Sequence, residues 1–304
     1  MTSKLAPIAL FTFKRLEHTR KTIEALKKNS LAADSDLIIY SDEGRNELEK
    51  KEVSNLRDYL NTITGFNKVV IIKQKSNLGL AKSITTGVTS VCEKYGKVIV
   101  LEDDLIASPT FLQFMNDALV FFEKQKKIIS ISGYRYPINM PLNYESDFFF
   151  LRIPLCWGWA TWQDRWSLYE KNLDEVKHVG SEKIKYINFN HSHNFFIQAK
   201  KNVTKKINTW FIFWYLSSAN NNKLTVFPKE SQIQNIGHDG SGEHCYENNI
   251  LNLKASPLDA NFTPLVILED AKILEAHIDF FSKNKVSFIQ KLKLKLRRVI
   301  NVFN

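Results

Sequence analysis

Short apolar runs alternate with longer stretches whose polar residues recur at helical spacing along the first 130 residues. The apolar runs are rich in β-branched and aliphatic residues without polar alternation, which is typical of strands buried on both faces of a parallel sheet. Strands are predicted at 7–13, 36–40, 68–74, 98–101 and 128–132, and helices at 16–29, 47–60 and 109–122, with a further helix ending near 95. This order predicts an α/β fold with right-handed crossovers between parallel strands.

Aromatic residues accumulate after residue 147. Trp157, Trp159, Trp162 and Trp166 are four of the six tryptophans of the chain. Trp162 and Trp166 have the spacing of one helix face, and we expect both in the core. Trp157 and Trp159 flank Gly158, and we expect these two rings to bind the acceptor as flat platforms for sugar rings.

Four segments complete the pattern up to residue 245. Residues 183–206 are polar and predict a solvated connecting helix, 210–219 an aromatic core helix, and 226–230 a short strand. The loop 235–245 follows, with three glycines and two histidines in eleven residues. Such a composition cannot pack a core and is typical of a lid over an active site.

Three consecutive carboxylates, Glu102, Asp103 and Asp104, follow the predicted strand 98–101. They would lie at its carboxyl end, where open α/β sheets bind ligands. Because adjacent carboxylates repel one another, a site that keeps all three ionised holds a cation or hydrogen-bond donors. A divalent ion, Mn²⁺ or Mg²⁺, held by one or two carboxylates and by substrate phosphates fits this pattern. The alternative is a solvated acidic turn that caps the helix beginning near 108–109.

The turn 76–82 is a second candidate for ligand binding. It places Gly79 where the backbone approaches another group and Lys82 on the first turn of a helix. A helix start beside a lysine favours phosphate. The turn matches neither a dinucleotide fingerprint nor a Walker loop, so an ordinary strand-to-helix connection is the alternative.

Composition narrows the class of protein. With 304 residues, 44% hydrophobic and 24% charged, the chain is typical of soluble globular proteins. Its three cysteines lack a CxxC pair, which indicates neither a disulfide framework nor a zinc site and fits a reducing, cytoplasmic compartment. No signal peptide and no run long enough to span a bilayer is expected.

The net charge of +10 is concentrated near the C-terminus, where seven lysines and arginines follow Phe280 and no acid does. The remainder is mildly basic, so general nucleic-acid binding is disfavoured. Residues 286–303 place apolar side chains mostly on one helical face and basic ones mostly on the other. This pattern predicts a helix lying on an anionic membrane, here the inner face of the cell membrane. A terminal helix packed on the domain is the alternative.

Several motifs together resemble the GT-A-fold nucleotide-sugar glycosyltransferases. They are PIALFTFKR, SDEG, SNLGLAKSITTGV, VIVLEDDL, CWGWATWQDRW and NIGHDGSGEHC, which span Pro7 to Cys245. The chain looks most like bacterial relatives of the N-acetylglucosaminyltransferase I family, which build surface polysaccharides. The resemblance implies a Rossmann-like nucleotide-sugar half at 1–135 and a mixed acceptor half at 136–280, followed by the basic helix 281–304.

The resemblance also implies roles for individual residues. The acidic triplet corresponds to a DXD-type motif, with Asp104 as direct metal ligand and the two residues before it near the ribose and donor sugar. His244 matches a histidine of a mobile loop that closes over the donor pyrophosphate, and is a second metal-ligand candidate. The residues implied to bind the nucleotide-sugar are Thr12, Arg15, Asp42, Asn77, Lys82, Glu102 and Asp103.

One departure leaves the catalytic base open. Some relatives carry an acidic residue where this chain has Phe211. The resemblance therefore does not identify which carboxylate of this chain is the base. Chemistry favours Asp239 and then Glu243, both in the predicted lid, ahead of Asp164. For Asp164, a structural pair with Arg165 is the alternative.

The function expected from these features is metal-dependent, inverting transfer of a sugar from a nucleoside-diphosphate sugar to a cell-surface glycan or lipid-linked glycan. A UDP-sugar is the expected donor, with N-acetylglucosamine as the sugar that the family suggests. One alternative is a sugar nucleotidyltransferase, but the loop after the first strand lacks the glycines that hold a triphosphate. The other is a non-catalytic carbohydrate-binding or peripheral membrane protein.

Overall fold

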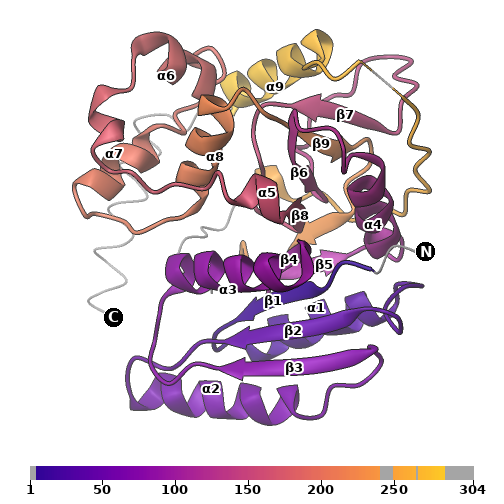
Figure 1. Cartoon of the computed structure of the whole chain (residues 1–304), viewed down its shortest axis with the longest axis vertical. Coiled ribbons are helices and arrows are strands. Elements are labelled where there is room, and N and C mark those ends of the chain that lie inside the picture. The colour runs from indigo at the N-terminus through magenta and orange to yellow at the C-terminus, as the bar shows by residue number, and fades with distance from the viewer. Residues whose placement is uncertain (1–4, 240–248, 265, 285–304) are drawn as a thin grey trace.

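The computed structural model describes residues 5–239, 249–264 and 266–284. In the first half, strands and helices alternate as predicted (Figure 1). The elements are β1 (Ile8–Thr12), α1 (Leu16–Lys27), β2 (Asp36–Ser41), α2 (Glu47–Leu60), β3 (Lys68–Lys73), α3 (Leu80–Tyr95) and β4 (Lys97–Glu102). The predicted order is therefore confirmed up to β4, and α2 begins and ends at the predicted residues.

The second half is more irregular. Its elements are β5 (Leu105–Ala107), α4 (Phe111–Phe121), β6 (Ile128–Ser132), β7 (Phe148–Leu151), β8 (Trp159–Trp162), α5 (Gln163–Trp166), η1 (Glu175–His178), α6 (Ser181–Ile187), α7 (Ile197–Val203), α8 (Phe211–Asn220), β9 (Leu224–Pro228), β10 (Ile233–Asn235), η2 (Asn249–Leu251) and α9 (Ala271–Lys283). Sequence patterning found α4, β6, α8 and β9 but missed the short strands β5, β7, β8 and β10.

One sheet of eight strands, in the order β3-β2-β1-β4-β8-β6-β9-β7, runs through the described residues. The strands β1 to β4 are mutually parallel, whereas β8 is antiparallel to both β4 and β6. β9 is parallel to β6, and β7 closes the sheet in antiparallel pairing with β9. The predicted fold class is thus confirmed: a Rossmann-like parallel half continues into a mixed half, as in GT-A folds.

Helices cover both faces of the parallel half (Figure 1). Ile8 and Leu10 of β1 belong to the core beneath α1 and α2, whereas Ala9 and Phe11 belong to the core beneath α3. This division follows from the alternation of side chains along a strand. Strand ends also align, because Phe11 pairs with Glu102 and Thr12 with Ser41. The loops after β1, β2 and β4 therefore meet at one edge of the sheet.

The tryptophan-rich segment corrects one prediction and confirms another. Residues 159–162 form strand β8 rather than part of a helix, since they pair with β4 and β6. Trp159 is fully buried and its ring stacks on Trp210 at 5.4 Å between centroids, so it cannot serve as an acceptor platform. Trp162 and Trp166 are buried as predicted. Trp157 remains partly exposed.

Two predictions about membranes concern the chain as a whole. The basic segment after residue 284 lies outside the described residues. Among the residues that are described, no helix combines the length and apolar character needed to cross a bilayer.

Helix α9 docks on the mixed half through a buried histidine. His277 is fully buried, and its Nδ1 donates to the Ile273 carbonyl oxygen at 2.7 Å. Its ring lies between the rings of Tyr136 and Phe149, with centroids 5.8 and 6.1 Å away. Burial lowers the pKa of His277 to about 4, because an imidazolium would lose its hydration there.

The buried His277 predicts a loss of stability in mild acid. Between pH 6.5 and 4 the unfolded chain binds a proton at this position and the folded chain does not, so stability falls as the pH falls, by about 3 kcal/mol at about pH 4. The variant His277→Phe keeps a ring but removes the titration. Urea unfolding at about pH 7 and 4 should show a loss about 3 kcal/mol smaller in the variant. Equal losses in the two proteins would contradict the assignment.

Candidate active site

The three predicted carboxylates lie at the carboxyl end of β4, as the sequence indicates. Glu102 ends the strand, and Asp103 and Asp104 form the turn into β5. Both aspartates are buried, with 5% and 6% of their surface exposed. The hydroxyl of Thr22, on α1, donates to the Asp103 carbonyl oxygen at 2.9 Å. The turn is thus held against α1 and is not a solvated cap.

Arg15, in the loop after β1, offsets part of the negative charge of this turn. Its Nη2 donates to Asp104 Oδ2 at 2.8 Å and also to the Asp103 carboxylate. Burial alone would lower the pKa of Arg15, but Asp103 and Asp104 outweigh that effect and raise it. The second terminal nitrogen, Nη1, is buried and has no hydrogen-bond partner in the described part of the chain. Arg15 therefore keeps one donor for a further acceptor.

Two carboxylates at this turn, those of Glu102 and Asp103, have pKa values above their ordinary range. Burial, followed by repulsion from Asp104 and Asp103, raises the pKa of Glu102 to about 8. Burial also raises the pKa of Asp103 to about 6, although Arg15 works in the opposite direction. A cation brought next to these groups would favour their ionised forms. The turn is therefore a place where positive charge is stabilised.

The start of the predicted lid lies directly against Asp104. The Ile236 amide donates to the Asp104 carbonyl oxygen at 2.9 Å. At Gly237 there is no room for a side chain, because a Cβ atom would lie 2.0 Å from Asp104 Oδ2. The antiparallel pairing of β10 with β5 brings the lid to this place.

His238 and Asp239 follow Gly237 and are the last residues described before 240. Both ring nitrogens of His238 are buried, without a hydrogen-bond partner among the described residues, and its ring meets the edge of Trp157 at 5.3 Å between centroids. Asp239 Oδ2 lies 3.0 Å from Nε2 of His18 on α1. The predicted base and the one exposed platform residue, Asp239 and Trp157, are thus gathered near the acidic turn.

Asp42, after β2, organises the turn that precedes α3. Its carboxylate accepts hydrogen bonds from the amides of Leu78 and Gly79, each at 2.9 Å. Gly79 has a φ of 72°, a left-handed conformation that favours glycine. Asn77 Nδ2 donates to the Glu43 carbonyl oxygen at 2.6 Å. Asp42 and Asn77 therefore shape this loop through contacts within the protein.

Thr12 and Lys82 both lie near the edge of the sheet where the acidic turn is found, but they differ in exposure. Thr12 is buried at the end of β1, and its hydroxyl donates to the Tyr40 carbonyl oxygen at 3.4 Å. Lys82 is exposed on the first turn of α3. Of these two, Lys82 has the charge and exposure to meet a phosphate.

Asp164 does not join the site. It follows Trp162, which pairs with Lys97 at the start of β4, so it lies at the opposite edge of the sheet. Its carboxylate accepts hydrogen bonds from Lys126 at 2.5 Å and Arg165 at 2.7 Å. Burial works against ionisation, but these bonds outweigh it and lower the pKa of Asp164. The structure agrees with the alternative that the sequence offered, a structural pair.

Glu243 and His244, the other predicted lid residues, lie outside the described residues. Two residues that sequence reasoning did not select lie near the site instead, namely His238 and His18. The signal for His238 was present, since the loop 235–245 contains two histidines and only the second was selected. For His18, no pattern along α1 distinguishes it from other polar helix residues.

The carboxylate oxygens of the acidic turn fit a divalent ion whose coordination shell is completed by substrate phosphates. Within the described residues, no cluster of three or more histidine, cysteine or acidic side chains could hold a metal by itself. Mg²⁺ and similar ions are commonly bound by only one or two carboxylates, with substrate phosphates completing the shell. Asp103 and Asp104 match that mode, and Asp104 Oδ2 is shared with Arg15.

Comparison with known proteins gives little beyond the fold. No family model and no curated protein matches the chain. Among solved structures, those of S. aureus TarS and of its residues 1–349 each match at a TM-score of 0.42 and 8% identity. The match covers 75% of this chain, but only 36% of the first structure and 59% of the second. A likeness of this degree supports no argument about this chain, and membership of the N-acetylglucosaminyltransferase I family stays a prediction.

The contact between Gly237 and Asp104 predicts a sharp effect of one methyl group. In Gly237→Ala the new Cβ would displace either the lid or the Asp104 carboxylate, since only 2.0 Å is available. We expect the affinity for UDP with Mn²⁺, measured by calorimetry, to fall at least about tenfold.

The matched control for this experiment is Gly180→Ala. At Gly180 nothing lies within 4 Å of the added atom, and φ is −70°, which alanine adopts without strain. This variant should bind as the wild type does. Unchanged affinity in folded Gly237→Ala would show that the lid contact does not govern the site.

Proposed function

We propose that this protein is a glycosyltransferase that moves a sugar from a nucleoside-diphosphate sugar to a glycan acceptor, with inversion and with the help of a divalent ion. The observation that carries the proposal is the group of Arg15, Asp104 and His238 at the carboxyl end of β4. It combines an acidic turn, whose negative charge Arg15 partly offsets, with buried nitrogen atoms that lack hydrogen-bond partners among the described residues. N-acetylglucosamine from a UDP-sugar is the donor that the sequence motifs favour.

The unpartnered nitrogens support a diphosphate ligand. A buried donor without a partner costs about 1–3 kcal/mol, so a ligand that supplies acceptors there gains that energy back. Arg15 Nη1 is such a donor, and a neutral His238 ring contributes another. Phosphate oxygens are strong acceptors for both, and a guanidinium binds them at short range.

The departing diphosphate gains negative charge as the bond from sugar to phosphate breaks. Arg15 stabilises that charge from a fixed position, because both aspartates hold its guanidinium before the reaction begins. Asp104, together with Asp103, would hold the divalent ion, which supplies Lewis-acid stabilisation when bound. Lys82, exposed on the first turn of α3, adds a second positive charge at the same edge.

The acceptor hydroxyl needs a base on the other side of the sugar. Asp239 is our choice, since its carboxylate lies beside the site and is half-exposed, which lets an acceptor reach it. His18, 3.0 Å away, orients this carboxylate. Trp157 then offers a partly exposed ring next to His238 on which the acceptor sugar can rest.

Replacement of Asp104 tests the proposed function. Asp104→Ala removes both the carboxylate for the ion and one anchor of Arg15, so sugar transfer should fall about 100-fold or more. The assay is release of UDP from UDP-sugars with Mn²⁺ and a glycan acceptor. Asp34→Ala, an exposed change in the loop before β2, should leave the rate unchanged. A folded Asp104→Ala enzyme with the wild-type rate would refute the site.

Replacement of Asp239 tests the base. Asp239→Asn keeps the shape but cannot take a proton, so turnover should fall about 100-fold or more. The melting-temperature rise that UDP-sugar and Mn²⁺ produce should stay as in the wild type, because the donor is bound by other residues. Unchanged turnover would assign the base to another residue.

A further inference from the structure

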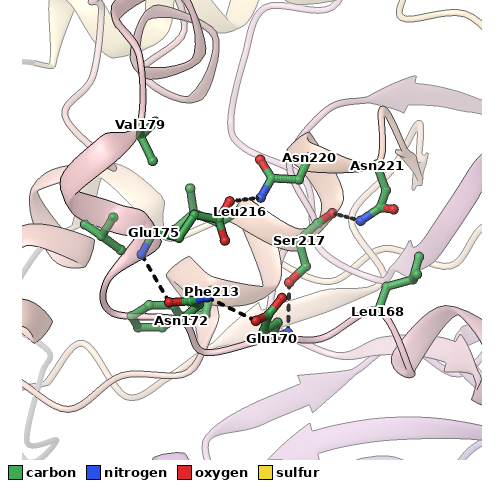
Figure 2. A pocket seen from close by; sticks show the side chains of 11 residues that line it. Leu168, Glu170, Asn172, Glu175, Val179, Phe213, Leu216, Ser217, Asn220 and Asn221 are labelled. Carbon is green, nitrogen blue, oxygen red and sulfur yellow. Dashed lines mark hydrogen bonds between the residues drawn. The ribbon is translucent and has the colours of Figure 1, made fainter.

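A separate cavity lies beside helix α8, outside the acidic turn. It has a volume of about 160 Å³ and lies between one face of α8 and the segment 168–179 (Figure 2). Phe213, Leu216, Ser217, Asn220 and Asn221 line one side, at the three- and four-residue spacing of a single helix face.

The direction of α8 leads this cavity away from the edge of the sheet that carries the acidic turn. Near its start, Trp210 stacks on Trp159, which pairs with Val100 towards the carboxyl end of β4. Its end at Asn220 leads into Leu224, which pairs with Ile128 at the opposite edge of the sheet. The cavity follows one face of α8 from Phe213 to Asn220, and none of the residues that line it belongs to the acidic turn or to the loops beside that turn.

The cavity has an apolar floor and a polar rim. Phe213, Leu216 and Val176 are buried and form the floor. The exposed rim carries two carboxylates and three primary amides, those of Glu170, Asn172, Glu175, Asn220 and Asn221. Among the described residues, the lining holds no lysine, arginine or histidine, although Lys171 Nζ lies 5.0 Å from the centroid of the Phe213 ring. With two carboxylates on the rim against this one neighbouring cation, the surface disfavours phosphate and other anions.

Hydrogen bonds hold the rim in place before any ligand binds. Asn220 Nδ2 donates to Glu175 Oε1 at 2.7 Å, and Asn172 Nδ2 donates to Glu170 Oε1 at 3.2 Å. The Glu170 amide donates to the Ser217 hydroxyl at 3.0 Å. Each carboxylate uses Oε1 in these bonds, so that Oε2 stays available as an acceptor. Carboxylates and amides fixed in this way match the neighbouring hydroxyls of a sugar.

The size of the cavity limits the ligand to about one ring. Pockets that hold drug-sized ligands have volumes of about 300–1,000 Å³, and this cavity is smaller. It corresponds to about five water molecules at about 30 Å³ each. An apolar floor with an aromatic ring suits the C–H face of a pyranose, whose hydroxyls then point towards the rim.

We propose that this cavity is a second carbohydrate subsite, which holds one neutral sugar unit of a glycan apart from the donor site. The binding of a sugar in this cavity does not depend on the proposed function. Only the identification of that glycan as the acceptor rests on it. A chain held at both places would stay bound between transfer steps, because the second contact becomes intramolecular.

The test is direct binding of neutral oligosaccharides to the full chain. Probes are N-acetylchitotetraose, cellotetraose and maltotetraose, with tetragalacturonate as the anionic comparison, followed by saturation-transfer NMR and calorimetry. We expect at least one neutral probe to bind at millimolar concentration and the anionic probe to bind at least about tenfold more weakly.

Two rim variants locate the binding. Glu175→Lys reverses one charge and removes the bond to Asn220, and Asn220→Trp fills the opening. Each should weaken binding of the neutral probe at least about tenfold. Glu182→Lys is the matched control, since Glu182 is exposed on α6 outside the cavity. Melting curves check that every variant is folded, and two different rim changes guard against misfolding of one.

The outcomes separate this inference from the proposed function. Asp104→Ala should keep oligosaccharide binding, and the rim variants should keep the response to UDP-sugar. The subsite is refuted if no neutral probe binds the wild type, if tetragalacturonate binds equally well, or if Asp104→Ala alone abolishes binding. Loss of binding in Glu182→Lys as well would also overturn it.

Discussion

Charge compensation at the end of β4 is the constraint on which the candidate site depends. Three carboxylates follow one another at the end of a buried strand, and burial raises the pKa of two of them, Glu102 and Asp103. Arg15 offsets this cost at Asp103 and Asp104 and so ties the loop after β1 to the turn after β4. The Nη1 atom of the same guanidinium has no hydrogen-bond partner among the described residues. One side chain therefore both compensates the charge of the turn and keeps a nitrogen that can donate to a further acceptor.

Close packing brings the segment after β10 against the acidic turn. The short strand β10 pairs with β5 and thereby delivers Gly237 onto the Asp104 carboxylate. His238 then contacts Trp157, just before β8, and Asp239 contacts His18 on α1. Residues from four distant stretches of the chain thus converge, and the absence of a side chain at Gly237 permits this.

Sequence patterning predicted the parallel half well, because its strands are long apolar runs and each crossover is local. It failed for β8, since the pairing of Trp159 with Val100 and Ser132 joins residues far apart in the chain and overrides a spacing that suits a helix. The acidic turn was predictable from residue types next to a strand. The loop 235–245 marked two histidines, but His238 was not chosen over His244, because the contact of His238 with Trp157 exists only in three dimensions.

The reversed direction of β8 has a consequence for how such a protein can diversify. The chain leaves the sheet after Trp162, opposite Lys97, and returns at Leu224, opposite Ile128. Both points lie at the edge of the sheet away from the acidic turn, so both ends of the segment 163–223 are anchored away from that turn. Insertions, deletions or exchange of this segment can alter the surface that it forms while the acidic turn keeps its geometry, provided that Trp210 and Trp214 still pack on Trp159.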